Sequence, residues 1–212
     1  MSTAAADTPA RTGAALERYY QFHSRIYDAT RWSFLFGRES ALMRASCVAR
    51  AQRILEVGCG TGRNLAGLRR HFPHAHITGV DLSEQMLAIA AKKIRDDQTT
   101  LLRRSYSAPV HPDGKRFDLV LFSYALSMFN PGWEQAIDAA WEDLAEGGCI
   151  AVVDFSHSNL AWFRRWMGVN HVRMEGHLWP YLGQKFVPLL DERFTAYGGV
   201  WQYGIFIGRK QR

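Results

Sequence analysis

The chain has 212 residues, of which 47% are hydrophobic and 22% charged, a balance typical of an ordinary globular domain. Its net charge of +6 favours an anionic partner, such as an acidic substrate or an anionic membrane surface, although a basic protein without such a partner has the same balance. The three cysteines, Cys47, Cys59 and Cys149, have no paired spacing, which argues against a disulfide framework or a zinc site. This cysteine usage makes the reducing cytoplasm the expected location. No apolar stretch reaches the roughly 18–20 residues that span a bilayer.

The N-terminal part is predicted to differ from the rest. Residues 1–13 lack the basic-then-apolar order of a signal peptide, and we expect a disordered leader. Residues 14–50 are rich in aromatic residues at helical spacing, with a glycine break at Gly37. This segment is predicted to be a helical cap over one end of the domain.

The central part, residues 51–155, alternates between apolar strands and amphipathic helices. One helix has Ser83 as a predicted N-cap, and another is expected to end at Gly147-Gly148. Alternating strands and helices imply a parallel sheet with helices on both faces. The predicted strands are 53–58, 76–82, 100–105, 116–127 and 149–156, and the predicted helices are 64–72, 83–97 and 133–145.

The C-terminal part, residues 191–212, reads as two strands, 193–199 and 201–210, joined by a glycine turn. A tight turn makes this pair antiparallel. We therefore predict one α/β domain over residues 14–212: a doubly wound, Rossmann-like seven-stranded sheet, mostly parallel with an antiparallel edge strand. Residues 156–190 are expected to cover the acceptor side of the site as a lid.

A glycine loop follows the first predicted strand, with Gly58, Gly60 and Gly62 in the order G-x-G-x-G. A dinucleotide-binding loop would have its third glycine one residue later. Glu56 precedes the loop and would oppose a pyrophosphate, but it suits a cationic ligand. Asp81 ends the second strand, where a carboxylate can accept both ribose hydroxyls. Together these residues indicate a nucleoside that carries an amino acid and a positive centre; the alternative is a tight strand–helix turn without a ligand.

The motifs "LEVGCGTGRN", "GVDLS" and "FDLVLFSYALS" resemble those of the class I S-adenosylmethionine-dependent methyltransferases, over about residues 50–155. The resemblance implies S-adenosylmethionine as cofactor, with the three glycines around its methionine part and Asp81 on its ribose. Leu82 and Met86 would pack near the adenine. The full set of expected cofactor contacts is Tyr27, Arg38, Glu56, Gly58, Gly60, Thr61, Gly62, Asn64, Asp81, Leu82, Met86, Tyr106 and Ser123.

One departure from that family concerns the adenine. Many relatives have an acid after the third strand, whereas "LLRRSYSA" offers only Ser105, Tyr106 and Ser107. We therefore expect the adenine to be held by backbone groups and by stacking on Tyr106.

The outer segments resemble the bacterial methyltransferases that trimethylate diacylglyceryl-homoserine to a betaine lipid, and the related phospholipid N-methyltransferases. The matching motifs are "HSRIYDATR", "FLFGR", "SYALSM" and "VVDFS...WFRRW...HV", and the match ends after His171-Val172. The resemblance implies N-methylation of a lipid head group. Alternatives are a soluble methyltransferase for a quinone, phenol or amine, a phosphatidylethanolamine N-methyltransferase, and a cofactor-binding protein without catalysis. No nucleic acid is expected, because the polar-Pro-Pro-aromatic motif of base-amine methyltransferases is absent.

Aromatic faces suit a methylated, cationic amine through cation–π attraction, and they serve equally to pack the cap onto the sheet. Arg38 is expected to pair with the carboxylate of the cofactor or of a homoserine head group, or to be a structural surface residue. In the helix that contains Trp162, Phe163 and Trp166, these rings share one face. Such a helix fits an anionic membrane surface, on the inner face of the membrane, or closes the pocket. The expected acceptor contacts are Tyr19, Tyr20, Tyr124, Trp162, Arg165 and Arg173.

Catalysis is expected to consist mainly of orientation, with a proton acceptor. His171, a tyrosine (Tyr27 or Tyr124) and water are the candidates for that role. Asp154 ends the fifth strand, but "DFSHSN" lacks the Asp-Asn pair of metal-dependent O-methyltransferases, so no metal is expected.

Overall fold

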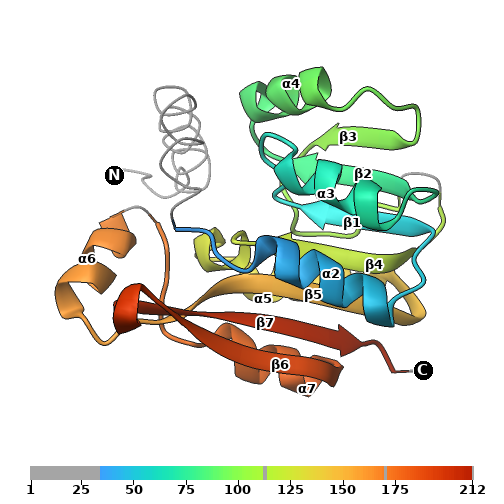
Figure 1. Ribbon diagram of the computed structural model, residues 1–212. Coiled ribbons are helices and arrows are strands. Elements are labelled where there is room, and N and C mark those ends of the chain that lie inside the picture. The colour runs from blue at the N-terminus through green and yellow to red at the C-terminus, as the bar shows by residue number, and fades with distance from the viewer. Residues whose placement is uncertain (1–33, 112–113, 170, 212) are drawn as a thin grey trace, which may run out of the picture.

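The structure is a computed structural model that describes residues 34–111, 114–169 and 171–211. Its centre is a seven-stranded sheet in the order β3-β2-β1-β4-β5-β7-β6 (Figure 1). The strands are β1 (Arg53–Val57), β2 (His76–Asp81), β3 (Thr99–Arg103), β4 (Phe117–Ser123), β5 (Leu144–His157), β6 (Val187–Ala196) and β7 (Trp201–Arg209). The α-helices are α2 (Arg38–Val48), α3 (Arg63–His71), α4 (Glu84–Lys93), α5 (Trp133–Asp143), α6 (Ala161–Val169) and α7 (Leu178–Lys185), with 3-10 helices η1 (Leu126–Met128) and η2 (Tyr197–Gly199).

The sheet confirms the predicted fold class. All pairings among β1–β5 are parallel, and β7 runs antiparallel between β5 and β6. After β3 the chain returns to the centre, so that β4 pairs with β1. This reversal of strand order sets the carboxyl ends of β1 and β4 side by side, where ligands bind in open α/β sheets.

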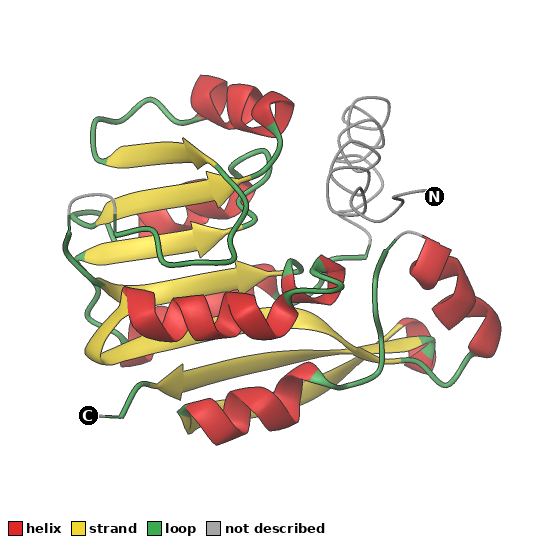
Figure 2. Cartoon of the chain, turned by 180° about the vertical axis from the view of Figure 1, so that it is seen from behind, coloured by secondary structure: helices red, strands yellow, loops and turns green. Residues whose placement is uncertain are grey.

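Helices cover both faces of the sheet. Successive residues of a strand point to opposite faces, so apolar residues of the central strands lie on both and each face packs against helices. Ile54 packs with α2 and α3 on the face in front in Figure 1, whereas Leu55 and Val57 pack with α5 and α7. Figure 2 shows α5 and α7 from behind, over the opposite face. A third cluster lies at the carboxyl ends of β4 and β5 and contains Tyr124, Phe155 and Phe163.

Two helices end earlier than predicted. The Ser83 side chain caps α4 as expected, by accepting from Met86 N at 3.3 Å, but the helix ends at Lys93 because Ile94 is extended. Helix α5 ends at Asp143, and β5 begins at the next residue. Gly147 and Gly148 therefore do not end a helix; they lie in β5, where the pairing with β4 shifts register between Phe117 and Leu119.

Helix α7 was not predicted, and it lies within the segment expected to be a lid. It packs against α5 and β7, with Trp179 closely opposed to Gly204. Pro180 is tolerated because it stands in the first turn. Strand β6 begins at Val187, before the range 191–212 that the sequence predicted for the strand pair. This part of residues 156–190 thus covers the sheet.

We expect Gly204→Ala to destabilise the fold by about 1–3 kcal/mol, because a Cβ atom there would lie 2.6 Å from the rigid Trp179 ring. Gly183→Ala in α7 is the matched control. Nothing lies within 4 Å of its Cβ position, so this change should stabilise the helix by about 0.5–1 kcal/mol. Urea unfolding measures both; equal stability of Gly204→Ala and the native chain would contradict the packing of α7 on β7.

Candidate functional site

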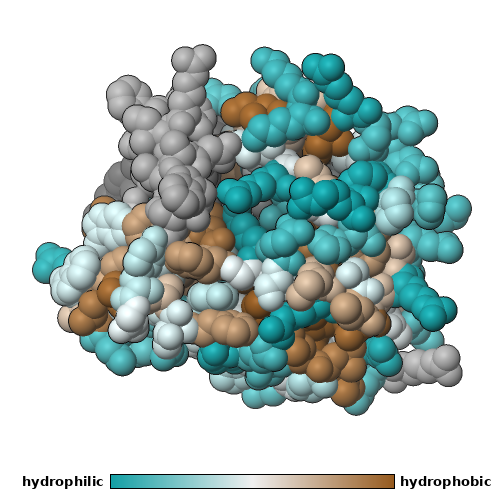
Figure 3. Space-filling view, viewed as in Figure 1, coloured by the Kyte–Doolittle hydropathy of each residue, from teal (hydrophilic) through white to brown (hydrophobic). Residues whose placement is uncertain are grey.

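A cavity of about 720 Å³ lies at the carboxyl ends of β1, β2 and β4. The loops after β1, β3 and β4 line it, together with Arg38 at the start of α2. Four further cations among the described residues line it. Arg104 follows β3, and Arg63, Arg70 and Lys93 come from α3 and α4, where hydrophilic side chains gather on the surface (Figure 3). A smaller adjoining pocket of about 330 Å³ shares Asn130 and His171 with it. The main cavity thus lies at the carboxyl ends of β1 and β4, where the reversal of strand order predicts a ligand site.

The three loop glycines all have positive φ angles, but their surroundings differ. A Cβ atom on Gly58 would lie 2.9 Å from the Ala125 Cβ, and one on Gly62 would lie 3.0 Å from the Ala90 Cβ. No atom lies within 4 Å of the Cβ position on Gly60. Protein packing thus accounts for two of the glycines, and only Gly60 leaves open space for a ligand to approach the backbone.

The Asp81 carboxylate fixes this loop to β2. Its Oδ2 accepts from Gly60 N at 2.8 Å, and its Oδ1 accepts from Ser83 N at 2.9 Å. Each carboxylate oxygen accepts more than one hydrogen bond, so the predicted ribose contact is compatible with both. Asp81 therefore has a structural task in the loop that the sequence did not reveal.

Glu56 is fully buried behind the loop. Asn64 Nδ2 donates to its Oε1 at 2.8 Å, and Oε2 has no hydrogen-bond partner among the described residues. Burial raises the pKa of Glu56 to about 8, against the opposing effects of the Asn64 bond and the Arg38 charge. A buried oxygen without a partner is costly, so a cationic hydrogen-bond donor from a ligand fits this position.

Ser123 adds a second unsatisfied group to the cavity. Its side chain is buried, and its Oγ has no partner among the described residues. Since Ser123 and Glu56 both line the cavity, the site matches a ligand with several polar groups.

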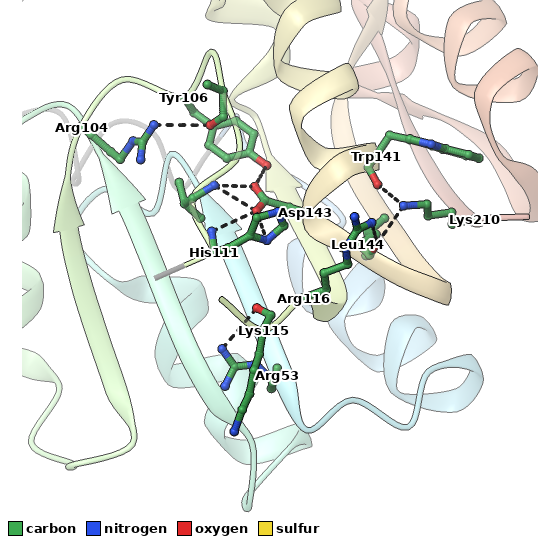
Figure 4. A network of polar contacts seen from close by, with 12 residues as sticks. Arg53, Arg104, Tyr106, His111, Lys115, Arg116, Trp141, Asp143, Leu144 and Lys210 are labelled. Carbon is green, nitrogen blue, oxygen red and sulfur yellow. Dashed lines mark hydrogen bonds and ion pairs between the residues drawn. The ribbon is translucent and has the colours of Figure 1, made fainter. Parts of the chain in front are cut away.

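Tyr106 comes from the loop after β3 and lines the cavity although it is only 6% exposed. Its hydroxyl points away and donates to Asp143 Oδ2 at 2.6 Å (Figure 4). Sequence reasoning missed Asp143, which is completely buried. The available signal was a charged residue on the otherwise apolar inner face of α5, which also carries Ala136 and Ala140.

Tyr124 also lines the cavity, with a positive φ of 56°. Its hydroxyl donates to Phe36 O at 2.7 Å, and burial raises its pKa well above 10. The centre of the Arg38 guanidinium lies 5.7 Å from the ring centroid. The hydroxyl is thus poorly suited to accept a proton near neutral pH, whereas the aromatic ring remains able to contact a ligand.

Most of the predicted site residues meet in the main cavity. Arg173 lines the adjoining pocket instead. Trp162 and Arg165 line neither pocket, because Phe163 and Met167 occupy the buried side of α6. The predicted residues in the main cavity are Arg38, Glu56, Gly58, Gly60, Thr61, Gly62, Asn64, Asp81, Leu82, Met86, Tyr106, Ser123, Tyr124 and His171; Tyr19, Tyr20 and Tyr27 lie outside the described residues.

Neither a metal-binding cluster nor a membrane-spanning helix is found among the described residues. They contain no group of three or more His, Cys, Asp or Glu side chains arranged to hold a metal ion. None of their helices has both the length and the apolar character needed to cross a bilayer. The Asp154 carboxylate is instead occupied by backbone groups: it accepts from Ser127 N at 3.1 Å and from Phe155 N at 2.8 Å.

Part of the chain is similar in sequence to known methyltransferases. Residues 54–148 match the family model described as a methyltransferase domain. A demethylmenaquinone methyltransferase of Tropheryma whipplei (strain Twist) is 30% identical over 148 residues, which cover 68% of this chain and 60% of that protein. The chain thus spans less than two thirds of the relative's length.

Solved structures show the same fold. The N-methyltransferase NodS from Bradyrhizobium japonicum WM9, in complex with S-adenosylhomocysteine, matches with a TM-score of 0.67 at 19% identity, covering 82% of this chain and 86% of that one. A Haemonchus contortus Phospholethanolamine N-methyltransferase 2 matches with a TM-score of 0.74 at 15% identity, covering 93% and 59%. Both structures are under 25% identical to this chain, so they show the fold that it shares with them, and the segment 54–148 matches the methyltransferase-domain model.

We expect the free energy of unfolding to fall as the pH rises from about 6.5 to 8. The pKa of Glu56 is about 8 in the folded protein and 4.5 ordinarily, so between these values the folded state binds more protons than the unfolded state. The slope reaches at most about 1.4 kcal/mol per pH unit. This window lies above the pKa of Asp154, which burial raises to about 6.

Urea unfolding across that range measures the slope. Glu56→Gln should reduce it, whereas the control Glu134→Gln, on the exposed side of α5, should leave it unchanged. An identical slope in Glu56→Gln and the native chain would show that Glu56 is already ionised in the folded protein.

Proposed function

We propose that this protein transfers the methyl group of S-adenosylmethionine to an acceptor bound in the main cavity. The observation that carries the proposal is the glycine loop, which Asp81 fixes and which is open at Gly60, with the unsatisfied Glu56 carboxyl behind it. When bound, the cofactor supplies an electrophilic methyl group on a sulfonium, which has to lie in line with the attacking atom.

Each part of the cofactor has candidate contacts in the lining. Glu56 would receive its ammonium group, since burial of a carboxyl without a full set of partners favours a cationic donor. Arg38 would pair with its carboxylate, and Asp81 would accept from the ribose hydroxyls. Leu82, Met86 and Tyr106 would hold the adenine.

For the acceptor we propose the amine of a lipid head group, most plausibly diacylglyceryl-homoserine, methylated up to three times. The buried Tyr124 ring offers an apolar, electron-rich face to an amine that becomes cationic as it gains methyl groups. The two N-methyltransferases among the similar folds agree with an amine acceptor. The adjoining pocket, lined by Arg164 and Arg173, extends the site towards α6.

The protein's own contribution to the reaction would be orientation and exclusion of water. A neutral amine would attack the methyl group and displace S-adenosylhomocysteine. After each of the first two transfers a proton leaves the nitrogen to water or to His171, which lines both pockets, whereas the third transfer gives a quaternary ammonium without a proton to lose. We assign Tyr124 to ring contact and not to proton transfer, because its hydroxyl is engaged with Phe36 O.

A second candidate is methylation of a quinone. The specific support is the relative named a demethylmenaquinone methyltransferase, which is similar to this chain over 148 residues. A quinone is apolar, as are the acyl chains of a lipid, and it would contact the same Tyr124 side of the main cavity.

The acceptor test uses S-adenosylmethionine labelled in its methyl group, incubated with the protein and a bacterial lipid extract. We expect label in a polar lipid that carries one to three additional methyl groups. Asp81→Ala is the inactive control, because it removes the support of the loop together with the ribose contact. Label found only in quinones would favour the second candidate, and label found only in water-soluble products would exclude both.

We also propose that α6 contacts an anionic membrane surface. Its outer side carries Trp162, 65% exposed, and Trp166, 48% exposed, while Arg165 adds a positive charge. Indole rings and arginines together suit the interface between lipid head groups and acyl chains.

Flotation with anionic liposomes tests this contact. We expect Trp162→Ala to reduce the bound fraction several-fold, because the ring lies in solvent and its loss removes interfacial area and not core packing. Met43→Ala, at another exposed apolar side chain on α2, should bind like the native protein. Equal flotation of both variants, or no binding by the native protein, would contradict a contact through α6.

A further inference from the structure

Asp143 is a completely buried carboxylate that the proposed methyl transfer does not use. It is the last residue of α5, directly before β5 begins, and it is not part of the cavity lining. Burying an ionised carboxylate is costly unless several hydrogen bonds compensate it. Its contacts therefore indicate what the residue is for.

All of these contacts lie in one segment, residues 106–111, between β3 and β4 (Figure 4). Tyr106 donates its hydroxyl to Oδ2 at 2.6 Å, and Val110 N donates to Oδ1 at 2.9 Å. His111 N donates to Oδ1 at 3.2 Å, and His111 Nδ1 lies 3.0 Å from the same oxygen. The Asp143 carboxylate thus accepts hydrogen bonds from one side-chain hydroxyl and two backbone N–H groups, all in a segment that forms no helix or strand.

The start of this segment, Tyr106 and Ser107, belongs to one wall of the main cavity, together with the two residues before it. Arg104, Ser105, Tyr106 and Ser107 all line it. The Tyr106 ring packs edge-on against Phe122 at 6.0 Å between centroids, while its hydroxyl is held by Asp143 on the far side. Burial and the Asp143 charge raise the pKa of Tyr106 well above 10, so the hydroxyl remains a donor. Both ends of the ring are therefore fixed.

We propose that Asp143 is a positioning residue for the cofactor: from α5 it fixes Tyr106 and the wall formed by residues 104–107, and so sets the affinity for the nucleoside part. The inference rests on the proposed cofactor. Residues 104–111 after β3 contain no acidic residue, and Asp143 supplies a carboxylate to this segment instead. The carboxylate reaches the loop from behind, through a helix that is distant in sequence.

The test measures the dissociation constant of S-adenosylhomocysteine by calorimetry, which needs no acceptor. We expect Asp143→Asn to weaken binding by about tenfold, because an amide cannot accept from all three donors. Tyr106→Phe keeps the ring and removes only the hydroxyl, so it should weaken binding by about threefold. In the double variant the two losses should be less than additive, since both break the same contact.

Lys210→Met is the matched control for stability. The Lys210 ammonium donates to Trp141 O at 2.5 Å and to Leu144 O at 2.8 Å, at the same end of α5 but away from the loop (Figure 4). The Lys210→Met variant should have a lower midpoint of urea unfolding, and its dissociation constant for S-adenosylhomocysteine should stay within about twofold of the native value. In assays with saturating acceptor, Asp143→Asn should raise the KM for S-adenosylmethionine and leave kcat nearly unchanged.

Two results would overturn the inference. One is an unchanged dissociation constant in both Asp143→Asn and Tyr106→Phe; if Asp143→Asn does not fold, Tyr106→Phe decides alone. The other is an equal loss of affinity in Lys210→Met, which would reduce the role of Asp143 to general stability. Failure of the native protein to bind S-adenosylhomocysteine would instead refute the proposed cofactor.

Discussion

The contact on which the site depends most is the hydrogen bond from Gly60 N to Asp81 Oδ2, 2.8 Å long. Parallel strands bring the loops at their carboxyl ends together, but they do not fix the course of a loop built from glycines. The second oxygen of Asp81 accepts from Ser83 N, at the start of α4. One side chain thus ties the glycine loop, β2 and α4 into a single support for a ligand.

Glu56 and Asp143 illustrate two uses of a buried carboxyl group. Asp143 receives donors at both oxygens, which is what a group that holds structure requires. Glu56 has one donor, from Asn64, and its other oxygen lacks a partner among the described residues. Burial raises the pKa of Glu56, and a ligand with a cationic donor would lower it again. The two carboxyl groups therefore differ in how completely the protein satisfies their hydrogen bonds.

Tyr124 connects the main cavity to a cluster of apolar and aromatic side chains. Tyr124 and Phe155 meet edge to face at 4.7 Å, and Phe163 stacks on Trp201 at 5.2 Å. This cluster joins the ends of β4, β5 and β7 to the inner side of α6. Because α6 buries Phe163, its two tryptophans are left on the outer side. The side chains of α6 are thus divided between core packing and the surface.

The sequence by itself determined the strand–helix alternation, the Ser83 cap and the spacing of the glycine loop, because each depends on backbone preferences and periodicity among near neighbours. It also placed Glu56 and Asp81 beside that loop. It did not predict α7 or the end of α5 at Asp143, since those boundaries follow from packing against strands distant in sequence. Only the tertiary structure decided which polar groups lose water: the partners of Asp143 and Tyr124 lie 32 or more residues away in the chain. Desolvation depends on the whole fold, and no local pattern records it.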